Sequence, residues 1–77
     1  MKPFSSGMEF AYAMFNNVMA ERGEKTHIQY ISEYGAAYAK ERGLPRRGHS
    51  RRTIERNMNR LAKAEEVQTD GKGWYWI

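Results

Sequence analysis

The chain has 77 residues with 13 Lys or Arg, nine Asp or Glu and no Cys, and its formal net charge is +4. This length predicts one domain over residues 1–77 with one small core, and the absence of Cys excludes disulfides and cysteine-ligated zinc. No apolar run approaches the roughly 20 residues that span a bilayer. Glu9, Asn16 and Asn17 interrupt the first apolar stretch, which is not typical of a signal peptide. We therefore expect a soluble cytoplasmic protein with no membrane partner.

The first predicted helix spans about residues 7–22. Ser6 and Glu9 have the spacing of a capping box, in which each side chain satisfies an amide at the helix start, and Gly23 ends the pattern. One side of the helix carries apolar residues at helical spacing, so this side is expected to face the core. The residues that share this side are Met8, Ala11, Tyr12, Phe15, Val18, Met19 and, at the end of the helix, Arg22.

Phe10 and Met14 fall on the opposite side of this predicted helix. Two alternatives stay open for them. They pack against Phe4 and the C-terminal strands, or they form a patch through which two copies associate.

The second predicted helix spans about residues 27–42. Thr26 and Gln29 repeat the capping-box spacing. Gly35 costs roughly 1 kcal/mol of helix propensity relative to Ala, which indicates a close helix crossing or a bend at this position. The apolar stripe of this helix comprises Ile28, Ile31, Gly35, Tyr38 and Ala39.

A connector over residues 43–49 leads to a third predicted helix of about residues 50–64. Pro45 lacks an amide donor and disfavours helical backbone at the residue before it, so the connector is not helical. Ser50 is the expected cap. Ile54, Met58 and Leu61 lie within about 40° of one direction on the helix and form its buried face.

The C-terminal segment predicts a β-hairpin of about residues 66–77. Two β-prone runs flank the turn signal Asp70-Gly71. A two-stranded hairpin alone is marginal in water, so Val67 and one face of the aromatic run 74–77 must pack on the helices. Three helices followed by a hairpin predict an α+β, mostly α fold with the layout of a winged helix-turn-helix.

The charge is unevenly distributed along the chain. Residues 40–63 carry nine Lys or Arg against two Glu, a local net charge of +7, and the remainder carries −3. A positive patch on a small domain is typical of a protein that binds a polyanion. The alternative is a basic face that is merely solvated.

The third predicted helix opposes its apolar face with Arg52, Arg56, Asn59 and Lys63. This pattern suits a helix in the major groove of DNA, where Arg pairs with guanine and Asn with adenine, while Thr and Lys reach phosphates. Contacts in such docking concentrate in the first half of the helix. The candidates on the helix are Arg51, Arg52, Thr53, Arg56, Asn57, Asn59 and Arg60, and Arg46, Arg47 and His49 in the long connector are expected to add backbone contacts.

The segment Ser50-Arg51-Arg52-Thr53-Ile54-Glu55-Arg56-Asn57-Met58-Asn59-Arg60-Leu61 resembles the recognition-helix segment of winged helix-turn-helix regulators of the DeoR-like and WYL-associated types. The family pattern is Ser-x-Arg-Thr-Ile/Val-x-Arg-Asp-Leu-x-x-Leu. The resemblance is strong over about a dozen residues and loose through residue 77. It implies that Ser50, Arg52, Thr53 and Arg56 face DNA and that Lys72 at the hairpin tip reaches phosphate or the minor groove.

The sequence departs from the family pattern at three positions. Asn57 replaces the usual Asp, Met58 replaces Leu, and Glu65 stands near the place where the family helix ends in Gly. Gly accepts the left-handed cap conformation far better than Glu does, so the end of the third helix is the least determined.

Other chemistries find little support in the residues. His27 and His49 lack metal-ligand spacing with a carboxylate pair, and Gly71-Lys72-Gly73 lacks the spacing and following helix of a phosphate-binding loop. The aromatic run 74–76 suits a strand that is half core and half surface better than a base-stacking platform. We expect no enzyme, no metal, no cofactor and no small-molecule ligand.

The leading hypothesis is a sequence-specific protein that binds double-stranded DNA and regulates transcription, with a homodimer on a two-fold-symmetric site expected. One alternative is a winged-helix protein-interaction module that uses the aromatic hairpin and the Phe10/Met14 patch. Another alternative keeps the DNA binding but assigns it to excision, replication or packaging of a mobile element.

Overall fold

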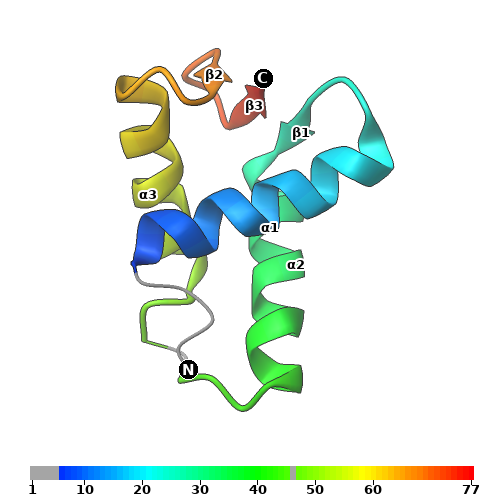
Figure 1. Cartoon of the computed structure of the whole chain (residues 1–77), viewed down its shortest axis with the longest axis vertical. Coiled ribbons are helices and arrows are strands. Elements are labelled where there is room, and N and C mark those ends of the chain that lie inside the picture. The colour runs from blue at the N-terminus through cyan, green and yellow to red at the C-terminus, as the bar shows by residue number, and fades with distance from the viewer. Residues whose placement is uncertain (1–5, 46) are drawn as a thin grey trace.

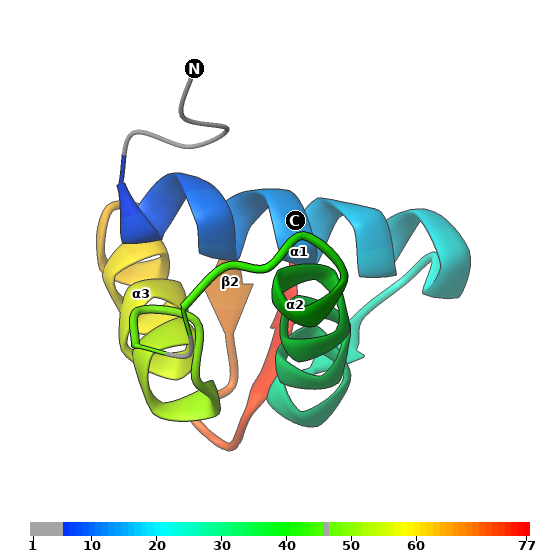
Figure 2. The ribbon, with the colours of Figure 1, turned by 90° about the horizontal axis from the view of Figure 1, so that it is seen from below.

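The computed structural model describes residues 6–45 and 47–77. Within them the element order is α1 (Gly7–Arg22), β1 (Thr26–His27), α2 (Ile28–Glu41), α3 (Arg51–Lys63), β2 (Gln68–Thr69) and β3 (Trp74–Trp76). The expected fold class, α+β and mostly α, is confirmed. α1 runs across α2 and α3, and the small sheet lies at one end of these two helices (Figure 1). Seen from below, α2 and α3 lie side by side under α1 (Figure 2).

The predicted helix bounds are correct to within about one residue because the local signals act as expected. Ser6 is the N-cap of α1, and its Oγ accepts a hydrogen bond from Glu9 N at 3.2 Å. Gly23 ends α1 with a φ of 90°, and its amide donates to Met19 O.

β1 is an element that the sequence analysis missed. It pairs antiparallel with β3, which pairs antiparallel with β2, so the strand order is β1-β3-β2. The predicted capping box of Thr26 and Gln29 is wrong. Thr26 is fully buried opposite Tyr75 in the sheet, and the N-cap of α2 is His27, whose Nδ1 accepts from Gln29 N at 3.1 Å. Strand pairing here overrides a local helix-start signal.

The core lies where α1 crosses the other two helices and meets the sheet. Phe10 and Met14 are buried there, so the self-association alternative for them is wrong. The ring of Phe10 packs edge-on against Tyr38 and His49, while Phe4 lies outside the described residues. The reason is geometric, because a helix that lies across two others and a sheet is covered over more than one side. The core cluster comprises Phe10, Ala11, Met14, Phe15, Ile28, Ile31, Ile54, Met58, Leu61, Val67 and Tyr75.

Gly35 marks the predicted close crossing of helices. A Cβ atom at Gly35 would lie 2.7 Å from Ile54 Cδ1 of α3 and 3.5 Å from Phe10 Cε2 of α1. The missing side chain therefore lets all three helices approach at one point, which fixes α3 relative to the rest of the fold.

Candidate nucleic-acid interface

α3 begins at a cap that uses two of the predicted site residues. The Oγ of Ser50 accepts a hydrogen bond from Thr53 N at 3.4 Å and lies 3.2 Å from Thr53 Oγ1. Both residues are half-buried. Their hydroxyls are thus engaged in holding the helix start, which gives them a positioning role.

The two faces of α3 differ sharply in chemistry. Ile54, Met58 and Leu61 are buried, as predicted. The opposite side is basic and exposed, and it includes the four residues that the helical spacing placed there. Its exposed members are Arg51, Arg52, Arg56, Asn59, Arg60 and Lys63.

The arginines of α3 have no partner within the described part of the chain. Arg51, Arg52, Arg56 and Arg60 form no hydrogen bond, ion pair or ring contact there, and the ion pair that does form joins Arg42 to Glu41 at 3.9 Å. No acidic group of the described residues therefore lies within ion-pair distance of these four guanidinium groups.

Two arginines elsewhere behave differently. The guanidinium of Arg22 lies 3.4 Å from the ring centroid of Tyr30, and that of Arg42 lies 3.7 Å from the ring centroid of Tyr38. Each guanidinium therefore lies over an aromatic ring. Among the described residues, the fold places a ring over these two arginines and none over the arginines of α3.

Asn57 is not on the exposed face, and its prediction as a DNA contact is a mistake. The residue is 7% exposed. A Cβ atom at Gly7 of α1 would lie 2.6 Å from Asn57 Nδ2, so the amide packs against the first turn of α1. Its direction is about 60° from Ile54 on the helix. That angle was a usable signal of burial.

Asn59 is exposed, but its side chain is engaged. The Tyr75 hydroxyl donates to Asn59 Oδ1 at 2.6 Å. This contact joins α3 to the central strand of the sheet across 16 positions of sequence. No periodicity in the sequence indicates it.

Lys72 lies exposed in the turn between β2 and β3, and this turn projects on the side away from α1 (Figure 2). The Asp70 carboxylate accepts hydrogen bonds from Lys72 N at 2.7 Å and Trp74 N at 3.3 Å. The bond from the Lys72 amide is the main reason that the pKa of Asp70 is lowered from its ordinary value of 3.8. The backbone of the turn is thus internally fixed, and it carries the exposed Lys72 side chain.

The connector before α3 contributes one exposed cation, Arg47. Arg46 lies outside the described residues. His49, expected to add a backbone contact, is half-buried: its Nδ1 lies 2.6 Å from Pro45 O, and its ring meets Phe10 with centroids 4.5 Å apart. Because a carbonyl oxygen only accepts, His49 Nδ1 carries the proton. His49 therefore attaches the connector to the core.

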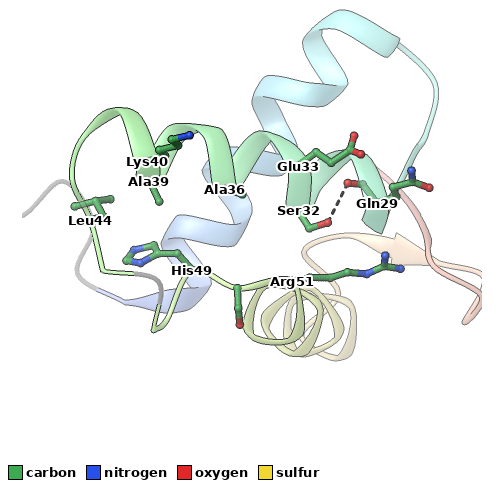
Figure 3. Close-up of a pocket in the computed structure, with 10 residues that line it drawn as sticks. Gln29, Ser32, Glu33, Ala36, Ala39, Lys40, Leu44, His49 and Arg51 are labelled. Atoms are coloured by element: carbon green, nitrogen blue, oxygen red, sulfur yellow. Dashed lines mark hydrogen bonds between the residues drawn. The ribbon is translucent and has the colours of Figure 1, made fainter.

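A groove of about 710 Å³ lies between α2 and the start of α3. Arg51 extends along it toward the first turns of α2, where Ser32 Oγ donates to Gln29 O at 2.9 Å (Figure 3). The exposed α2 residues beside it are small or of mixed charge. The groove is lined by Gln29, Ser32, Glu33, Ala36, Ala39, Lys40, Leu44, His49, Ser50 and Arg51.

Two other kinds of feature are absent from residues 6–45 and 47–77. No three His, Asp or Glu side chains come close enough together to hold a metal ion. In the same ranges, no helix combines the length and apolar character that crossing a bilayer requires.

Comparison with known proteins gives no match, neither to a protein-family model nor to a curated protein or a solved structure.

Proposed function

We propose that the chain is a sequence-specific, double-stranded DNA-binding protein of the winged helix-turn-helix type. α3 enters the major groove, and the β2–β3 turn lies along the backbone. The proposal draws support from the element order, the sheet order β1-β3-β2 and the turn beside α3. The observation that carries it is the exposed face of α3, on which four arginines have no partner among the described residues.

The chemistry of that face suits DNA. The major groove is about 12 Å wide and admits an α-helix, and Arg pairs bidentately with the O6 and N7 atoms of guanine. Arginines without internal partners lose no ion pair or ring contact when they turn to a base or phosphate. Neutralised phosphates supply much of the affinity, so binding weakens steeply as salt rises.

The resemblance of residues 50–61 favours one use of DNA binding, the regulation of transcription by a small protein. One α3 and one turn make a limited interface, so we propose that two copies bind a two-fold-symmetric site. The two half-sites then lie about 34–36 Å apart, one helical turn of DNA. The stoichiometry of the complex on a duplex with one half-site or two tests this arrangement.

The alternative of a protein-interaction module has lost part of its expected contact surface. Phe10 and Met14, which were to form it, are 2% and 0% exposed. For the DNA hypothesis, Asn57 is buried and His49 is attached to the core, while the described arginines of the expected interface remain exposed.

The deciding experiment compares the arginines of α3, which have no partner among the described residues, with Arg22, which lies over the ring of Tyr30. Arg52→Ala and Arg56→Ala are measured against Arg22→Ala, which removes the same charge from α1, by fluorescence anisotropy with a duplex of about 20 base pairs. Each α3 variant is expected to weaken binding to its preferred site about 5- to 150-fold, equivalent to about 1–3 kcal/mol, and to blur base preference. Arg22→Ala is expected to change affinity less than about twofold. Equal losses in all three variants, or none in the α3 variants, contradict the assigned face.

A further inference from the structure

The hydroxyl of Tyr75 forms a hydrogen bond between two side chains that joins the sheet to α3. Tyr75 is 2% exposed at the centre of β3, yet its hydroxyl donates to Asn59 Oδ1, 2.6 Å away on the outward side of α3. The bond therefore connects the middle of the hairpin to the face that carries Arg52 and Arg56.

The hydroxyl is suited to remain a donor. Burial raises the pKa of Tyr75 from its ordinary value of 10, the charges of Glu55 and Asp70 raise it further, and a hydrogen bond with the Thr69 side chain offsets part of the rise. At neutral pH the group is protonated, and a buried hydroxyl without a partner would be costly. Asn59 Oδ1 accepts the hydrogen bond that the buried Tyr75 hydroxyl needs.

The hairpin beyond this bond is short and internally fixed. β2 has two residues and β3 three. Asp70 Oδ1 accepts from Lys72 N and Trp74 N, and Thr69 Oγ1 accepts from Gly71 N at 3.1 Å. A turn of this kind moves as one body, so the place of Lys72 is set by the contacts that attach the strands to the helices.

We propose that Asn59 is a positioning residue: through Tyr75 it holds the Lys72 turn at a fixed place relative to the arginine face of α3, so that both engage one duplex together. This inference rests on the proposed function. It revises the role expected for Asn59, because bidentate pairing with adenine uses the amide oxygen as an acceptor, and Tyr75 already donates to that oxygen.

The first experiment needs no DNA. Tyr75→Phe removes the hydroxyl and keeps the ring in the core, Asn59→Ala removes the acceptor, and the double variant combines them. Tyr12→Phe on α1 is the matched control for the hydroxyl, and exposed Asn16→Ala is the control for helix propensity. We expect the equilibrium constant for unfolding to rise about 5-fold more in Tyr75→Phe than in Tyr12→Phe. The double variant is expected to lose no more than Tyr75→Phe, because both changes break one bond.

The same variants are followed by NMR in the free protein. Tyr75→Phe is expected to shift the side-chain amide of Asn59 and the backbone amides of residues 70–73. Additive losses of stability together with unchanged Asn59 amide signals would show that the bond is absent in solution and would overturn the proposal. If Tyr75→Phe does not fold, the backbone amides of residues 70–73 are followed in Asn59→Ala, with Asn16→Ala as the control, and unchanged signals there overturn the proposal.

The second experiment measures coupling on DNA. Lys72→Ala is expected to weaken binding about 3- to 10-fold in the wild-type background and less than about 2-fold in Tyr75→Phe, because a detached turn contributes little in either form. General loss of stability does not produce that difference when both proteins are folded. An equal effect of Lys72→Ala in both backgrounds overturns the proposal.

A scan of base substitutions separates positioning from base contact. We expect Asn59→Ala and Tyr75→Phe to leave the same pattern of base preference. If Asn59→Ala removes discrimination at one base pair that Tyr75→Phe retains, Asn59 reads that base and the positioning role is wrong. If the wild-type protein binds no duplex, the proposed function fails and the role on DNA fails with it, while the free-protein experiments still decide whether the bond exists.

Discussion

α2 and α3 perform the same packing task with different outward faces. Both place one apolar stripe under α1, and they touch each other at Gly35 and Ile54. The outward residues of α2 are small or of mixed charge, whereas those of α3 are mostly basic. Packing thus explains the inner faces of both helices and leaves the outer face of α3 unexplained. The outer face of α3 is therefore the surface on which we look for function.

The largest expected effect comes from moving charge between the two outer faces. Arg56→Glu combined with Glu33→Arg keeps the net charge at +4 while it makes the α3 face more acidic. We expect affinity for duplex DNA, measured by anisotropy, to fall at least about 100-fold. Both positions are exposed, so the free energy of unfolding is expected to change by less than about 0.5 kcal/mol.

Glu33→Arg alone is the control for this exchange. It raises the net charge and leaves α3 intact, so it is expected not to weaken binding. Should the exchanged protein bind as tightly as wild type, total charge and not the face of α3 determines affinity.

The next largest effect is a change in stability at the contact between α2 and α3. Gly35→Ala gains roughly 1 kcal/mol of helix propensity, but its Cβ would lie 2.7 Å from Ile54 Cδ1, which is fully buried. Overpacking of this kind costs about 1–3 kcal/mol, so we expect a net loss of about 1 kcal/mol in urea denaturation.

Ile54→Val identifies the cause of that loss, because it removes the Cδ1 atom. The substitution costs about 0.5–1.5 kcal/mol in a well-packed core. It is expected to cost less in the Gly35→Ala background, where it relieves the crowding. Strictly additive effects would argue against a close contact between the two helices at this point.

The C-terminal ends of the two helices offer a smaller and opposite pair of effects. In α2, Leu44 N donates to Ala39 O and Gly43 N to Lys40 O, with a Gly43 φ of 65°. In α3 the same pattern is made by Glu66 N to Leu61 O and Glu65 N to Ala62 O, with a Glu65 φ of 63°. Both are Schellman motifs, but α3 places a side chain where the backbone favours Gly.

We expect Glu65→Gly to raise the free energy of unfolding by about 0.5–1 kcal/mol and Gly43→Ala to lower it by about 1 kcal/mol. A Cβ at Gly43 meets nothing within 4 Å, so the loss there is a pure backbone effect. Thermal denaturation measures both. A loss of stability in Glu65→Gly would mean that the Glu side chain contributes more than its backbone strain costs.

Local signals were sufficient for the helices and insufficient for contacts distant in sequence. Caps, glycines and the period of 3.6 residues predicted the helix bounds, the buried stripe of α3 and the close approach at Gly35. They failed at Thr26, where pairing with Tyr75 decided the structure. At Asn57 the polar side chain was given more weight than the helical period, which places this residue about 60° from Ile54 and on the buried side.

For the candidate site, helical spacing predicted which side of α3 is basic and exposed, and the turn signal Asp70-Gly71 predicted the hairpin. Neither indicates what each side chain touches. The link between Asn59 and Tyr75 depends on the register of β3 against β1 and β2, which is fixed by the whole sheet. Composition and periodicity carry no information on that register.

The smallest expected effect contrasts the start of α3 with the turn beside it. Ser50 caps α3 with a hydroxyl that does not titrate in the acidic range, while the turn depends on the Asp70 carboxylate. Because the pKa of Asp70 is lower in the folded protein than its ordinary 3.8, the unfolded chain takes up its proton first as pH falls. Asp70 therefore stabilises the fold fully above its unfolded pKa, and this contribution is lost as pH falls through the folded value.

Acid titration from about pH 5 to pH 2, followed by the amide signals of residues 70–74, measures this effect. Asp70→Asn keeps an oxygen acceptor but cannot titrate, so the difference between the two titrations isolates the carboxylate. We expect the turn amides of wild type to shift in this range, those of Asp70→Asn to stay still, and the Thr53 amide at the start of α3 to change equally little in both proteins. Identical titrations at residues 70–74 would show that the carboxylate does not fix the turn, and Lys72 would then lack the rigid support that its reach toward a phosphate requires.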